Sequence, residues 1–107
     1  MNDATPSNPP VRSTFADDPS MHELIEYFVE EIPSRVDALQ DAWQAQDAET
    51  VERLTHQLKG ASGGYGFKVI SDAATALELP LKQGETELQQ LSDEFAQLID
   101  LCRRVMF

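Results

Sequence analysis

The chain has 107 residues, with 19 acidic and 8 basic side chains that give a formal net charge of −11. A chain of this length predicts one domain with one hydrophobic core, too small to hold separate catalytic and regulatory domains. The negative charge argues against nucleic acids and anionic membranes as partners, because binding to phosphates depends on Lys and Arg.

The sequence also indicates a compartment. It lacks an apolar run of the roughly 18–20 residues that span a bilayer, and it lacks the basic start and apolar core of a signal peptide. Its single cysteine, Cys102, cannot form an intramolecular disulfide and suits a reducing compartment. These features predict a soluble, cytoplasmic protein.

The N-terminal segment reads as a tail. Residues 1–14 contain Pro6, Pro9 and Pro10 and almost no apolar side chains, so ordering them would bury too little surface. We expect residues 1–17 to be disordered and residues 18–107 to form one helical domain.

Two helices are expected before residue 47. The first begins at a cap formed by Asp18 or Ser20 and runs to about residue 31, with apolar residues at helical spacing. Pro33 predicts a boundary, because the residue before a proline is disfavoured in the α conformation. The second helix would cover about 33–46, with Trp43 in its apolar seam.

Three more helices follow, over about 47–65, 67–82 and 85–106, each with apolar residues at alternating three- and four-residue steps. Asp47 is the expected N-cap of the first of them, and Pro80 should kink or end the second. Short connections make successive helices antiparallel. The sequence therefore predicts an all-α fold, an up-down antiparallel four-helix bundle with an additional short N-terminal helix.

One face of the 47–65 helix is unusual. His56 points away from the apolar seam, and Lys59, Gly60 and Gly63 share its side at +3, +4 and +7. A helical glycine costs about 0.5–1 kcal/mol relative to alanine, so these glycines leave a bare strip at a cost in stability. A neutral imidazole is a nucleophile and a lysine attracts phosphoryl oxygens. This combination predicts a phosphoryl acceptor on which another protein docks.

The spacing of His56, Lys59, Gly60, Gly63 and Gly66 is H-x-x-K-G-x-x-G-x-x-G. This pattern resembles that of histidine-containing phosphotransfer (HPt) domains. The resemblance implies that a receiver-domain phosphoaspartate, or a hybrid kinase, phosphorylates His56, which passes the group to another receiver. It also implies a phosphocarrier without turnover of its own.

The resemblance assigns further roles. Lys59 would stabilise charge on the phosphoryl group, and the partner would dock on Gly60, Gly63, Gln57 and Phe67. The chain, a monomer, would bind no metal or cofactor, and Mg²⁺ would belong to the partner receiver. In this family a side chain from another helix often holds the second imidazole nitrogen. The sequence alone does not identify that side chain, although a carboxylate or an amide would suit the role.

Other interpretations stay open. A helical module that docks on receiver domains without being phosphorylated would share these features, and so would an acidic bundle used as a scaffold. The chain could also be a domain excised from a hybrid kinase.

Overall fold

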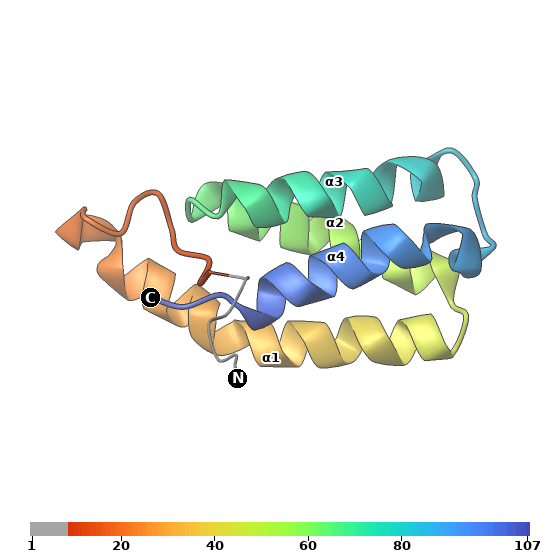
Figure 1. Ribbon diagram of the computed structural model, residues 1–107, viewed down its shortest axis with the longest axis horizontal. Helices are drawn as coiled ribbons and strands as arrows, with labels where there is room; N and C mark the ends of the chain where they lie inside the picture. The colour runs from red at the N-terminus through yellow and green to blue at the C-terminus, as the bar shows by residue number, and fades with distance from the viewer. Residues whose placement is uncertain (1–8) are drawn as a thin grey trace, which may run out of the picture.

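The structure, a computed structural model, describes residues 9–107. Its helices are α1 His22–Gln44, α2 Ala48–Gly64, α3 Lys68–Lys82 and α4 Ser92–Arg103, with short 3₁₀ helices at Pro19–Met21 and Leu88–Leu91. Successive α-helices run in opposite directions and lie side by side (Figure 1). The predicted all-α antiparallel four-helix bundle is confirmed. No helix among the described residues is long and apolar enough to span a bilayer.

Helix α1 differs from the prediction of two helices meeting at Pro33. It continues through Pro33 without a break, and within residues 9–107 the only helix before it is a three-residue 3₁₀ turn. The buried residues Phe28, Ile32 and Val36 follow one another at four-residue steps across the proline. A proline inside a helix costs about 3 kcal/mol. Burial of this continuous stripe outweighs that cost, because each large apolar side chain contributes about 1.5–3 kcal/mol.

The remaining helices keep their predicted order. Asp47 caps α2, since its side chain accepts hydrogen bonds from the backbone N–H and the hydroxyl of Thr50. Pro80 lies in the last turn of α3, which ends two residues later, before Gly84 at a φ of +102°. The expected helix over 85–106 is shorter, because a 3₁₀ helix precedes α4.

The core fills the space between the four helices. Phe28 of α1 stacks on Phe67 with ring centroids 4.8 Å apart, and Trp43 stacks on Phe95 of α4 at 4.0 Å. Cys102 is buried among these helices, and burial raises the pKa of its thiol to about 12. The thiol is therefore expected to be unreactive, because it is buried and stays protonated.

Residues 9–17, expected to be part of a disordered tail, instead pack against one end of the bundle. Val11 is buried, and its backbone bonds to that of Arg104 and Met106 at 2.8 and 2.9 Å. The Ser13 hydroxyl donates to the Tyr65 carbonyl at 2.6 Å. The remainder of the predicted tail, residues 1–8, lies outside the described residues.

Candidate functional site

The site lies where α2 and α3 pack together. A three-residue turn joins these antiparallel helices, and residues equally far from Phe67, the last residue of the turn, face each other. Gly63 contacts Ser71 across this interface, and His56 and Glu78 lie seven residues farther along their respective helices. Seven residues make about two helical turns, which keeps His56 and Glu78 on the same faces as Gly63 and Ser71. The fold thus brings together two side chains separated by 22 positions.

His56 combines an exposed ring with a buried partner. Its side chain is 59% exposed, whereas that of Glu78 is 3% exposed. The Nδ1 atom of His56 lies 2.6 Å from Oε2 of Glu78, which is a short hydrogen bond. This contact fixes one edge of the imidazole against the bundle.

Glu78 binds two lysines as well. Its Oε1 lies 2.7 Å from Nζ of Lys59, and its Oε2 lies 3.6 Å from Nζ of Lys82. Burial by itself would raise the pKa of Glu78. The hydrogen bonds from Lys59 and His56 and the charges of the two lysines outweigh burial and lower that pKa below its ordinary value of 4.5. Glu78 is therefore ionised at neutral pH.

The ionised carboxylate determines the state of the neutral imidazole. A carboxylate can only accept hydrogen bonds, so Nδ1 of His56 must carry the hydrogen. In the neutral ring the other nitrogen, Nε2, then keeps its lone pair. Nε2 has no hydrogen-bond partner among the described residues. The geometry thus gives one oriented nucleophilic nitrogen on an exposed ring.

Lys59 lies on the same face of α2 as His56, as predicted, and its side chain is 31% exposed. It pairs with the oxygen of Glu78 that His56 leaves free. Glu78 therefore holds the lysine ammonium beside the imidazole.

The glycines on this face have different environments. A Cβ added to Gly60 would meet nothing within 4 Å, so the packing of this chain does not require a glycine there. A Cβ on Gly63 would lie 3.3 Å from Oγ of Ser71, so Gly63 serves the approach of α2 to α3. Gly66 has a φ of +86°, and its Cβ would lie 2.5 Å from Oγ of Ser13. Gly66 is therefore a structural residue.

Two other candidates are placed differently. Gln57 is exposed next to His56, as a docking residue must be. Phe67 is 0% exposed and stacks on Phe28, so the prediction that it contacts a partner is corrected: Phe67 is a core residue. Ser62 is also buried, and its hydroxyl donates to the Leu58 carbonyl, so that hydroxyl is not available to a phosphoryl group on the exposed face.

A shallow depression of about 430 Å³ surrounds His56, lined by Glu49, Glu52, Arg53, Gln57, Glu78 and Lys82. Its lining contains both cations and carboxylates. Within residues 9–107 no group of His, Cys, Asp or Glu side chains is arranged to hold a metal ion.

Sequence reasoning did not identify Glu78, although a signal for it existed. Glu78 falls in step with the apolar residues Ala74 and Leu81, on the side of α3 that the periodicity predicts to be buried. A carboxylate in a buried stripe needs a charged or hydrogen-bonding partner, and an exposed histidine on the neighbouring helix could supply it.

Comparison with protein families gives one result. The family model described as "Hpt domain" matches residues 23–105, which cover most of the chain. Comparisons with curated proteins and with solved structures gave no significant match.

Proposed function

Because the chain belongs to the Hpt domain family, whose members carry phosphoryl groups in two-component phosphorelays, we propose that His56 is its phosphoryl acceptor. The observation that supports this assignment is the hydrogen bond from Nδ1 to the buried Glu78, which leaves Nε2 free and solvent-facing. Hpt domains interact with receiver domains and act as phosphocarriers. We propose that the donor and the acceptor of this chain are receiver domains.

The proposed transfer needs no proton movement at the attacking atom. The lone pair of His56 Nε2 attacks the phosphorus of a receiver's aspartyl phosphate, and the N–P bond forms as the bond to the aspartate oxygen breaks. The aspartate leaves as a carboxylate with the electron pair of that bond. Because Nδ1 keeps its hydrogen, the phosphorylated ring carries a positive charge, which lies beside the Glu78 carboxylate.

Glu78 therefore has two roles in this proposal. Before transfer it selects the tautomer whose nucleophile is Nε2, and after transfer it stabilises the charged ring. Reversal of the same step would pass the phosphoryl group to a second receiver. Lys59 lies one turn from His56 and would contribute positive charge to the phosphoryl oxygens. Mg²⁺ would be supplied by the receiver, with no ligands from this chain.

The open space above Gly60 supports docking on this face. An aspartyl phosphate lies in a pocket of its own protein, so the two backbones must come close for Nε2 to reach it. Gly60 lies one turn from His56, and a Cβ at this position would have no neighbour within 4 Å, which leaves room for that approach. Gln57 would lie at the edge of the contact.

The test is transfer of radiolabelled phosphate from a phosphorylated receiver domain in the presence of Mg²⁺. We expect acid-labile, base-stable label on the wild-type chain and none on His56→Gln, whose amide cannot attack phosphorus. His22→Gln is the matched control, because it removes the other histidine and should keep the label. Equal labelling of His56→Gln would refute the assignment. Binding without label across a panel of receivers would favour an unphosphorylated docking module.

A further inference from the structure

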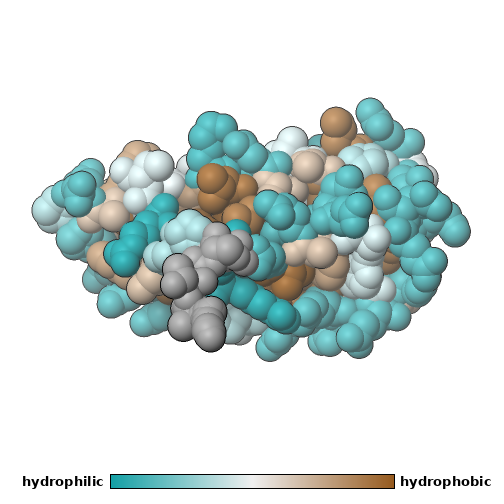
Figure 2. Space-filling view, viewed as in Figure 1, coloured by the Kyte–Doolittle hydropathy of each residue, from teal (hydrophilic) through white to brown (hydrophobic). Residues whose placement is uncertain are grey.

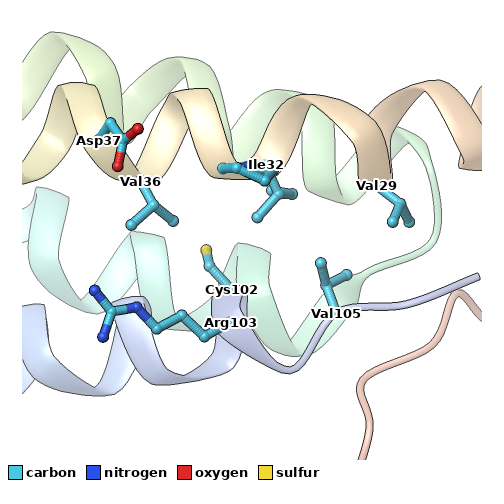
Figure 3. Close-up of a pocket in the computed structure, with 8 residues that line it drawn as sticks. Val29, Ile32, Val36, Asp37, Cys102, Arg103 and Val105 are labelled. Carbon is cyan, nitrogen blue, oxygen red and sulfur yellow. The ribbon is translucent and has the colours of Figure 1, made fainter.

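An apolar groove runs between α1 and α4. One hollow in it, of about 430 Å³, is lined mainly by apolar side chains, and in Figure 3 Val29, Ile32 and Val36 of α1 face Cys102 and Val105. A second hollow of about 330 Å³ continues it along α4, and Arg103 lines both. The further lining residues are Pro33 and Asp37 in the first hollow, and Gln40, Phe95, Ala96, Ile99 and Asp100 in the second.

The groove has the dimensions of a helix-binding site. On the α1 side it extends from Val29 to Gln40, which at about 1.5 Å per residue is roughly 17 Å, or about three helical turns. Figure 2 shows that this side of the molecule is mostly hydrophilic, with an apolar patch where α4 meets α1. Amphipathic helices commonly bind in apolar grooves of this kind.

The α1 edge of the groove is acidic. Glu26, Glu30, Pro33, Asp37 and Asp41 follow one another at three- and four-residue steps, which places them in one row along the helix. Pro33 and Asp37 line the groove, and Glu30 lies in the same row between the two ends of the groove. Glu26 and Asp41 continue the row just beyond those ends. The four carboxylates are exposed and form no ion pair within residues 9–107.

Pro33 adds an acceptor to the same edge. Proline has no amide hydrogen, so the carbonyl of Val29, one turn earlier, lacks the hydrogen bond that residue 33 would otherwise donate. Both residues line the groove. This edge therefore combines negative charge with a carbonyl that lacks its regular helical hydrogen bond.

We propose that the α1–α4 groove binds an amphipathic helix of a partner protein, with its apolar face in the groove and Lys or Arg along the edge over α1. The acidic row complements that basic edge, and Arg103 on the α4 side directs it toward α1. A second copy of this chain fits poorly, because it brings another net charge of −11 and another acidic row. The groove does not include the α2–α3 face of His56, so this proposal is independent of the phosphoryl assignment.

The experiment uses the full ¹⁵N-labelled chain and synthetic helical peptides of about 14 residues. The first peptide has leucines at i, i+3, i+4 and i+7 and lysines along one edge. In the second the lysines are replaced by glutamates, and in the third the leucines are replaced by serines. We expect saturable binding of the first peptide alone, with the largest amide shifts at Val29, Ile32 and Ile99 and none at His56.

Charge reversal on the chain tests the acidic row. Glu30→Lys/Asp37→Lys should weaken binding of the lysine peptide roughly fivefold or more, because two contacts with the basic edge of the peptide become repulsive. Glu87→Lys/Asp93→Lys makes the same change in net charge on exposed residues outside the groove and should bind like the wild type. Thermal melts of both variants would check that they are folded.

Three results would overturn the proposal. The glutamate peptide could bind as well as the lysine peptide, the two double variants could weaken binding equally, or the shifts could map to another face. A dimer in sedimentation of the chain alone, with the groove as its interface, would also overturn the proposal, because it would assign the site to a second copy.

Discussion

Replacement of Glu78 by glutamine tests the arrangement on which the phosphoryl assignment depends. The substitution keeps the shape of a side chain that is almost fully buried and removes its negative charge. In the wild type that charge accepts a hydrogen bond from His56 at 2.6 Å and binds Lys59 at 2.7 Å. Both partners remain in the variant without their counter-charge.

The expected loss of stability is moderate. Hydrogen bonds to charged groups contribute about 1.5–3 kcal/mol each when buried. The exposure of His56 and Lys59 reduces that contribution through solvent screening, and the amide keeps one acceptor. We expect Glu78→Gln to lower the free energy of unfolding by about 1–3 kcal/mol. For a domain of this size that corresponds to a decrease of roughly 5–15 °C in Tm.

The effect on transfer should exceed the effect on folding. The glutamine amide can donate to Nδ1, which would move the ring hydrogen to Nε2 and remove the lone pair that attacks phosphorus. In a buried catalytic triad the wrong histidine tautomer costs about 10⁴ in rate. The His56 ring is more exposed and can reorient, so we expect a decrease of roughly 10- to 1000-fold.

Rapid-quench measurement of transfer from a phosphorylated receiver would give this rate at a temperature where both proteins are folded. Glu87→Gln, an exposed carboxylate away from the site, is the matched control and should transfer at the wild-type rate. Ring ¹⁵N shifts of His56 would report the tautomer directly. A Glu78→Gln variant that transfers within about twofold of the wild type, with Nε2 still unprotonated, would refute the reasoning.

Further predictions concern the glycines and pH. Gly60→Ala and Gly64→Ala should each stabilise the fold by about 0.5–1 kcal/mol, because neither added methyl meets a neighbour. Only Gly60→Ala should slow phosphoryl transfer, and equal transfer rates in the two variants would contradict the docking role of Gly60. Gly66→Ala should lower stability in urea by about 1–3 kcal/mol, because of its φ of +86° and the nearby Ser13, and an unchanged midpoint would be inconsistent with that geometry. Since the pKa of Glu78 is lowered on folding, its contribution to stability is complete above about pH 4.5 and is lost as the pH falls through the folded value. The stability difference between the wild type and Glu78→Gln should therefore shrink on acidification. A difference that grows as the pH falls would contradict this prediction.

The apolar periodicity predicted the helices well, and the exception has a physical cause. Pro33 indicates a break by local rules, yet Phe28, Ile32 and Val36 keep one stripe through it. Whether the helix breaks at Pro33 or continues through it depends on whether the other helices bury that stripe. The local sequence shows the proline, which destabilises a helix. It does not show the burial that compensates for it, because that burial is provided by residues far along the chain.

The N-terminal segment could not be predicted for a related reason. Val11 and Ser13 are isolated among prolines and polar residues, so local composition indicates disorder. Their order depends on hydrogen bonds to Arg104 and Tyr65, which lie more than 50 positions away. Such pairings follow from the assembled bundle and leave no periodic signal in the sequence.

The site was predictable in part. His56, Lys59 and Gly60 share one helix, so their spacing alone places them on one face. Glu78 comes from the neighbouring helix, and its place opposite His56 depends on the length of the α2–α3 turn. Phe67 shows the converse error, because its proximity to the motif in sequence suggested an exposed role for a core residue.

The most direct test of the central claim is the position of the phosphoryl group on the His56 ring. NMR of the ¹⁵N-histidine-labelled chain, phosphorylated by a receiver domain, would identify the substituted nitrogen through its coupling to ³¹P. We predict phosphorus on Nε2 of His56, with the hydrogen of Nδ1 retained toward Glu78. Phosphorus on Nδ1, or on His22, would contradict the account.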